Sequence, residues 1–174
     1  DRMPENPFTP LDTILLIDHG KIQAMGAPGD IPCPAGAEVI DARGLIAAPG
    51  YLDWQINGAF GDDFTDNPDS ICRVAGQLPR FGVTAFLPTI ISSPAEKIAA
   101  GRKVVQGGRP GDFCGAQPLG LHLKGPFLNP EKRGALNPKH LRLPDAADAA
   151  DWSPAGGVRM VTLAPELPGA LEVI

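Results

Sequence analysis

Two residues with reactive side chains, His122 and Lys124, lie in a stretch where apolar and polar residues alternate. This stretch, residues 119–129, places leucines between Gly120, His122 and Lys124 and then reaches a Gly-Pro pair. Alternation with a period of two predicts a buried strand, with the polar side chains on one face. In parallel α/β folds, catalytic and metal-binding side chains gather at the carboxyl ends of strands. The sequence therefore places an imidazole and an ammonium group where chemistry is expected.

The ammonium group of Lys124 limits what that chemistry can be. A protonated lysine has no lone pair to offer a divalent cation, and it repels the cation. Lys124 could become a ligand only by losing its proton, which requires strong desolvation. His122 points to the same face and could be a ligand or a substrate contact. A lone histidine is more often a hydrogen-bonded core residue. Both interpretations of His122, as a contact or as a core residue, stay open.

A second pair of polar residues, Gln55 and Asn57, ends another apolar segment that begins at Tyr51. Residues two apart on a strand point to the same side, so we expect both amides at one edge of the sheet. Neutral amides are poor zinc ligands but suit hydrogen bonds to a water or to a substrate amide. The alternative is that they satisfy buried backbone groups.

The remaining candidate metal ligands are scattered. The chain holds three histidines, and we place His19 in a turn and His140 in a proline-bounded loop. No site with three histidine ligands can be drawn from these positions. The three cysteines form no C-x-x-C pair and are expected to be thiols in a reducing cytoplasm.

Length and composition limit the class of protein. The 174 residues allow one domain, or one domain with a small appendage. The 21 glycines and 20 prolines are expected to punctuate many short loops. A net charge of −5 offers no basic surface for nucleic acid and argues against binding to anionic membranes. No long apolar run or signal peptide is visible, so we expect a cytoplasmic protein without a membrane segment.

The first part of the chain, residues 1–50, is predicted to be an accessory β module. A hairpin is expected from residues 13–17 and 21–26 with a turn at Asp18-His19-Gly20, followed by a short strand at 38–41.

From residue 51 to 174 the pattern changes to strands that alternate with helices. The predicted strands are 51–57, 83–88, 118–124 and 158–163. The predicted helices are 68–80, with Asp66 or Asn67 near its N-cap, and 93–105, opened by a Ser93–Glu96 capping box. This alternation predicts an α/β fold with a parallel sheet.

Four such strands cannot close an eight-stranded barrel. If the four strands are part of such a barrel, their outer edges are exposed and need a partner strand. We then expect the chain to self-associate as a homo-oligomer, to pair with a missing C-terminal half, or to be a piece of a longer protein. The alternative is a smaller, complete α/β fold.

Several motifs resemble those of one family. Residues 120–127, Gly-Leu-His-Leu-Lys-Gly-Pro-Phe, resemble the Gly-Leu-His-Leu-Glu-Gly-Pro-Phe signature of the N-acetylglucosamine-6-phosphate deacetylases, in the amidohydrolase superfamily. Gln55 and Asn57 match the family's Gln-x-Asn, and residues 162–166 match its Thr-Leu-Ala-Pro-Glu. The resemblance covers about residues 12–170.

The resemblance implies a fold, a cofactor and a reaction. The fold would be a partial (β/α)8 amidohydrolase-type barrel of about four strands, after a small N-terminal β-sandwich segment. Relatives use a divalent metal, zinc or iron, to remove the acetyl group from N-acetylglucosamine-6-phosphate. Lys124 occupies the position of the family's glutamate ligand, and Leu136 that of a histidine near the sugar.

Two functions of different class follow. The chain could be the N-terminal half of such a metal-dependent deacetylase, inactive alone because further ligands come from later strands. It could instead be a non-catalytic module that binds an amino-sugar phosphate or assembles with a partner. Gln55, Asn57, His122 and Leu136 are the candidate substrate contacts, and no catalytic residue is expected in this chain.

Overall fold

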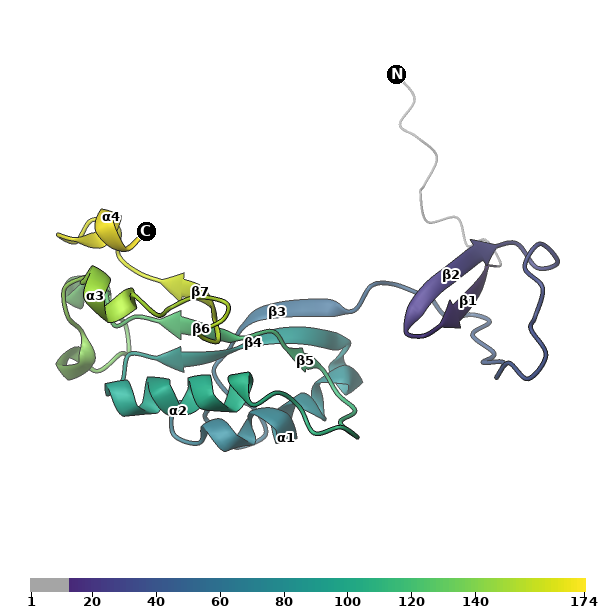
Figure 1. The fold of residues 1–174 in the computed structure, drawn as a ribbon, viewed down its shortest axis with the longest axis horizontal. Coiled ribbons are helices and arrows are strands. Elements are labelled where there is room, and N and C mark those ends of the chain that lie inside the picture. Colours follow the sequence, from purple (N-terminus) through teal and green to yellow (C-terminus); the bar gives the residue numbers. More distant parts are fainter. Residues whose placement is uncertain (1–12) are drawn as a thin grey trace, which may run out of the picture. The chain divides into compact units, whose positions relative to one another are not determined.

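The computed structural model describes residues 13–174 and shows an α/β chain with two compact units (Figure 1). One unit ends at Ala48 and the other begins at Pro49. Among the residues described, no helix is long and apolar enough to cross a membrane.

The first unit contains the predicted hairpin. Strand β1 (Ile14–Asp18) pairs antiparallel with β2 (Lys21–Gly26). The two turn residues, His19 and Gly20, have φ angles of 48° and 71°. Positive φ at both central positions is the geometry of a tight hairpin turn, in which glycine is favoured. The hairpin prediction is therefore confirmed.

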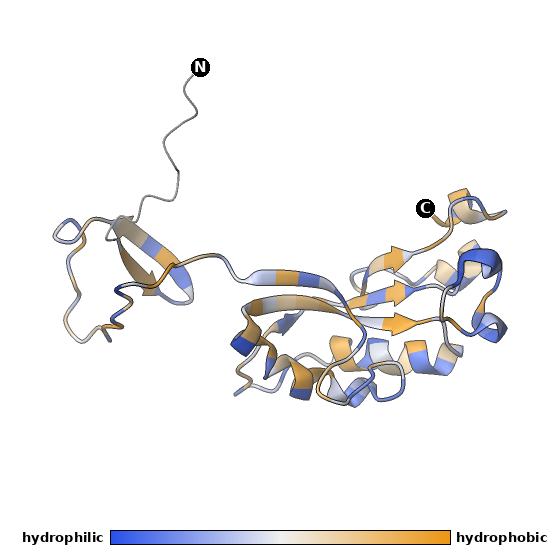
Figure 2. Cartoon of the chain, turned by 180° about the vertical axis from the view of Figure 1, so that it is seen from behind, coloured by the Kyte–Doolittle hydropathy of each residue, from blue (hydrophilic) through white to orange (hydrophobic). Residues whose placement is uncertain are grey.

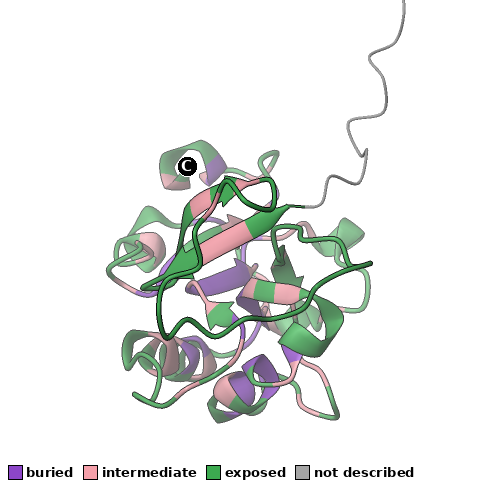
Figure 3. Cartoon of the chain, turned by 90° about the vertical axis from the view of Figure 1, so that its right-hand side faces the viewer, coloured by how far each residue is buried: buried purple, intermediate pink, exposed green. Residues whose placement is uncertain are grey.

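The strand expected at residues 38–41 is wrong, because the structure has no strand between β2 and residue 51. Val39 and Ile40 are 77% and 80% exposed. A short apolar run becomes a strand only beside a partner strand, and the described residues of this unit offer none. They form one two-stranded sheet (Figure 3), so a sandwich of two sheets stays a prediction.

The second unit is built on a mostly parallel sheet. Its strands are β3 (Tyr51–Ile56), β4 (Val83–Ile91), β6 (Leu121–Lys124) and β7 (Val158–Thr162), in the order β3-β4-β6-β7. A two-residue strand, β5 (Gln117–Pro118), also pairs with β4. All of these pairs are parallel. The predicted parallel sheet is confirmed.

The strand predicted over 118–124 is split into β5 and β6. Gly120 has a φ of +130°, which side chains rarely adopt. This residue breaks the ladder between the two short strands. Leu119 still donates its N–H to the carbonyl of Phe86 at 3.0 Å, so the chain stays beside β4.

The helix predicted over 68–80 is divided into three pieces: 3-10 turns at Pro68–Ser70 and Leu78–Phe81, and helix α1 (Ile71–Ala75). Asn67 is the N-cap residue of the first turn, but its side chain makes no capping hydrogen bond. Gly76 is the C-cap residue of α1 and has a helical φ of −62°. Ile71, Ala75 and Leu78 are buried as expected.

Helix α2 (Ala95–Gln106) forms close to its predicted range, but the capping box at Ser93 does not. The N-cap residue is Pro94, and the buried hydroxyl of Ser93 has no hydrogen-bond partner among residues 13–174. Gly101 of α2 lies against Ile90 and Leu121, where a Cβ would come within 3.2 Å of the Ile90 side chain. This glycine lets α2 pack closely on the sheet.

The hydrophobic core lies between the sheet and helices α1 and α2, which cover one face (Figure 1). Phe64, Phe86, Leu121 and Leu123 have no exposed surface. Figure 2 shows the apolar residues on the strands and hydrophilic residues in the loops beyond their carboxyl ends. Two short helices, α3 (Ala146–Ala149) and α4 (Ala170–Val173), follow β6 and β7.

Candidate functional site

The carboxyl ends of the parallel strands form one edge of the sheet. The strands end at Ile56, Ile91, Lys124 and Thr162, and register pairs join Ile91 with Lys124 and Lys124 with Thr162. The predicted polar residues of β3 and β6 therefore lie on a common edge of the sheet, as parallel pairing requires.

His122 is buried at this edge, with 1% of its surface exposed, and both ring nitrogens are engaged. Its Nδ1 lies 2.8 Å from the carbonyl oxygen of Trp54, and its Nε2 lies 2.7 Å from the hydroxyl of Thr162. A carbonyl can only accept, so Nδ1 carries the proton. In the neutral ring, Nε2 then accepts the hydrogen bond that the Thr162 hydroxyl donates.

This arrangement gives His122 the hydrogen-bonded core role that lone histidines usually take. The ring connects β6 to β3 and β7 and leaves no nitrogen lone pair free. Burial lowers the pKa of His122, an effect that outweighs the favourable carbonyl of Trp54, and the positive charge of Lys124 lowers it further. The imidazole is thus held in its neutral form.

Lys124 is the last residue of β6, and its side chain is half-buried. Its backbone carbonyl accepts a hydrogen bond from the hydroxyl of Ser92 at 3.2 Å. Within residues 13–174, the ammonium group has no ion pair and no hydrogen bond. A positive charge without a counter-charge therefore lies at the carboxyl edge.

Gln55 and Asn57 are both exposed, at the end of β3 and just beyond it. The backbone N–H of Gln55 donates to Asp53, and the carbonyl of Asn57 accepts from Phe64 at 2.9 Å. Within the described part of the chain, their side-chain amides make no hydrogen bond. The amides are therefore accessible to a ligand, and their role as substrate contacts stays a prediction.

Leu136 lies in the loop between β6 and α3. Its side chain is half-buried, and its carbonyl accepts a hydrogen bond from Arg133 at 2.6 Å. Its backbone is thus held within the loop, while its side chain offers a ligand only apolar contact.

Thr162 and Asn129 are polar residues at this edge that the sequence reasoning did not identify as contacts. Asn129 donates from its side chain to Glu166 at 2.9 Å. This bond, and one from the backbone N–H of Glu166, lower the pKa of that carboxyl group. Thr162 and Glu166 both belong to the Thr-Leu-Ala-Pro-Glu match, and this match could have indicated that Thr162 and the partner of Glu166 lie at the site.

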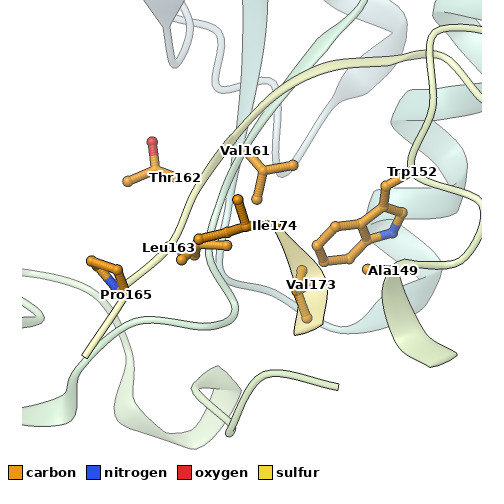
Figure 4. Close-up of a pocket in the computed structure, with 8 residues that line it drawn as sticks. All are labelled: Ala149, Trp152, Val161, Thr162, Leu163, Pro165, Val173 and Ile174. Atoms are coloured by element: carbon orange, nitrogen blue, oxygen red, sulfur yellow. The ribbon is translucent and has the colours of Figure 1, made fainter. Parts of the chain in front are cut away.

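A hollow of about 590 Å³ lies beside β7 (Figure 4). Its lining is mostly apolar and includes Trp152, Val161, Leu163 and Ile174. In Figure 4 the Thr162 hydroxyl points away from these apolar side chains. Thr162 borders the hollow from the carboxyl edge, but His122 and Lys124 are not part of its lining.

The residues at this edge do not fit a divalent metal. The described residues contain no group of three or more His, Cys, Asp or Glu side chains placed to hold one. Both nitrogens of His122 are hydrogen-bonded, and the neighbouring charge on Lys124 repels a cation. The metal centre implied by the resemblance cannot be assembled from the described residues.

No protein-family model matches the chain. Human N-acetylglucosamine-6-phosphate deacetylase is 45% identical over 146 residues, which cover 77% of this chain and 34% of the human protein. N-acetylgalactosamine-6-phosphate deacetylase of Escherichia coli O157:H7 is 34% identical over 150 residues, 82% of this chain and 38% of that protein.

The crystal structure of N-acetylglucosamine-6-phosphate deacetylase from Pasteurella multocida matches the fold with a TM-score of 0.79. The two are 28% identical, and the match covers 92% of this chain and 42% of the other. The chain thus spans about a third of the length of the human relative and two-fifths of the solved structure. It is a homologue of the N-acetylglucosamine-6-phosphate deacetylases and corresponds to a portion of them.

Proposed function

We propose that this chain is the N-terminal part of an N-acetylhexosamine-6-phosphate deacetylase and does not deacetylate by itself. The observation that carries the proposal is the 45% identity to the human deacetylase over 146 residues. The chain also has a parallel sheet whose strands end at one common edge, where such folds place their chemistry.

In this proposal, residues 51–174 supply the first four strands of a (β/α)8 barrel. Strands β3, β4, β6 and β7 are neighbours in chain order, all parallel, with α1 and α2 on one face. That order is expected of half a barrel. Residues 1–50 would belong to the N-terminal β-sandwich segment, with β1 and β2 as two of its strands.

We propose that the chain is inactive because its residues cannot supply the ligands of the metal ion. The family resemblance implies a zinc or iron ion, yet Lys124 stands where a carboxylate ligand is expected. The other ligands would come from strands outside these 174 residues. Lys124 also makes the metal site unfavourable in a longer chain, because one anionic ligand is exchanged for a cation.

The second candidate is a non-catalytic module that binds an amino-sugar phosphate or assembles with a partner. The unpaired ammonium of Lys124 and the apolar Leu136 favour it. In either case, the outer edges of β3 and β7, which no other described strand covers, would drive self-association or pairing with the remaining barrel strands.

A chimera tests the proposal. This chain would replace the matching portion of the human relative, with Lys124 kept or changed by Lys124→Glu. We expect the Lys124→Glu chimera to release acetate from N-acetylglucosamine-6-phosphate and the Lys124 chimera to be at least about a hundredfold slower, the scale of a lost ligand.

Acetate release by the 174-residue chain alone would contradict the proposed inactivity. Equal activity of the two chimeras would show that Lys124 is compatible with catalysis. A Lys124→Glu chimera that folds, binds metal and remains inactive would favour the non-catalytic module.

A further inference from the structure

The carboxyl edge of the sheet carries a positive charge that nothing in the described chain neutralises. Lys124 is half-buried and has no ion pair or hydrogen bond at its ammonium group within residues 13–174. Charges taken out of water are normally paired, because partial desolvation penalises an isolated ion. A half-buried, unpaired lysine therefore favours binding of a counter-ion.

Several acidic side chains that follow the neighbouring strands have partners other than Lys124. Asp62 pairs with Arg73 and Asp66 with Lys97 after β3. Asp148 pairs with Arg142 after β6, and Glu166 accepts from Asn129 after β7. Asp62, Asp66 and Asp148 are thus neutralised by other basic groups, and Glu166, bound to a neutral amide, makes no ion pair with Lys124 among the described residues. A ligand can therefore supply the counter-ion of Lys124.

The loop after β6 strengthens the positive field. Residues 124–142, called the basic segment below, contain five basic residues (Lys124, Lys132, Arg133, Lys139 and Arg142) and one acidic residue, Glu131, in a chain of net charge −5. Arg142 is paired with Asp148, which leaves four basic residues to strengthen the field. In Figure 2 this loop lies beyond the carboxyl ends of β4 and β6, where the ribbon is strongly hydrophilic. The local charge is opposite in sign to that of the whole chain.

The side chains of His122 and Thr162 beside Lys124 are neutral and hydrogen-bonded to each other, so they add no charge that would compete with Lys124. His122 is neutral at this edge, and Thr162 pairs in register with Lys124. Lysine serves in phosphate sites as a compact point charge, and several basic groups favour a dianion over a monovalent carboxylate.

We propose that Lys124, with the basic segment, forms an anion site that binds a phosphate monoester. That the natural ligand of this site is a sugar phosphate rests on the proposed function. The preference of the site for a phosphate dianion does not.

Calorimetric titration of the full chain with inorganic phosphate, glucosamine 6-phosphate and glucosamine tests the site. Both phosphates should bind, more weakly as salt rises, and glucosamine should not. Lys124→Gln should weaken phosphate binding at least about tenfold, the scale of a charged hydrogen bond. Lys124→Arg keeps the charge and should stay within about threefold of wild type.

Lys103→Gln is the matched control, since it removes one positive charge from the exposed side of α2. We expect less than about a twofold change, because a distant surface charge is screened. Equal weakening by Lys124→Gln and Lys103→Gln, or no phosphate binding by wild type, would overturn the anion site.

An NMR titration of the unmodified chain avoids dependence on a variant that fails to fold. Phosphate should move the side-chain Cε signal of Lys124 and leave that of Lys103 in place, and the reverse result would overturn the site. If inorganic phosphate binds through Lys124 but glucosamine 6-phosphate binds no tighter, the anion site stands and the proposed substrate fails. If glucosamine 6-phosphate binds and Lys124→Gln has no effect, the anion site fails and the proposed function survives.

Discussion

Strands β3 and β6 belong to one sheet but differ in their neighbouring strands and in the exposure of their side chains. β6 lies between β4 and β7, and Leu121, His122 and Leu123 on it have at most 1% exposed surface. Among the described strands, β3 pairs with β4 alone, and Leu52 and Trp54 are 51% and 65% exposed. A strand with neighbours on both sides has its side chains ordered by packing, whereas an edge strand keeps side chains available to a further partner.

The largest difference between the two strands is expected in the unfolding free energy that is lost when a leucine is changed to alanine. Leu123→Ala on β6 removes a side chain with no exposed surface and should lower the free energy of unfolding by about 2–5 kcal/mol. Leu52→Ala on β3 is the matched change at a half-exposed site and should cost less than about 1 kcal/mol. Urea unfolding measures both, and equal losses would contradict the comparison.

A smaller effect is expected at the hydrogen bond between β6 and β7. Thr162→Val keeps the side-chain shape but leaves Nε2 of His122 buried without a donor. Unfolding free energy should fall by about 1–3 kcal/mol, the cost of an unsatisfied buried polar group. Thr84→Val, at an exposed position of β4, provides the control and should change stability by less than about 0.5 kcal/mol.

The smallest effect should be a dependence of stability on pH that originates in His122. Its pKa in the folded chain lies below the ordinary value of about 6.5, so the unfolded chain takes up this proton first. The stabilisation is present above pH 6.5 and is lost as pH falls through the lowered pKa.

Urea titrations between pH 7.5 and about 5 would measure this loss. His122→Gln removes the titrating group and should flatten this part of the profile. An unchanged pH profile in His122→Gln would assign the dependence to other groups.

The sequence could predict those helices, strands and turns that are marked by a periodic pattern of apolar residues or by local turn residues. The hairpin at Asp18-His19-Gly20, the parallel strands and helix α2 all formed close to their expected ranges. The strand at 38–41 failed because strand formation depends on a partner that local sequence does not reveal. The Ser93 capping box failed because Pro94 became the N-cap residue.

The candidate site could be predicted in position but not in its contacts. Alternation placed His122 and Lys124 on a common face, and the structure puts them at the carboxyl edge. Neither the Trp54 carbonyl nor the Thr162 hydroxyl could be assigned to His122, because they lie 68 and 40 residues away in the sequence. The free charge of Lys124 likewise depends on where four acidic side chains find their partners.

Lys124 gives the carboxyl edge a positive charge where the family resemblance implies a metal-binding carboxylate. Equilibrium dialysis of the purified chain against zinc, with metal content measured per chain, tests it most directly. We expect far less than one zinc per chain, and no decrease on His122→Gln. Close to one zinc per chain, lost on His122→Gln, would contradict it, because the imidazole would then be a ligand and Lys124 would not exclude the cation.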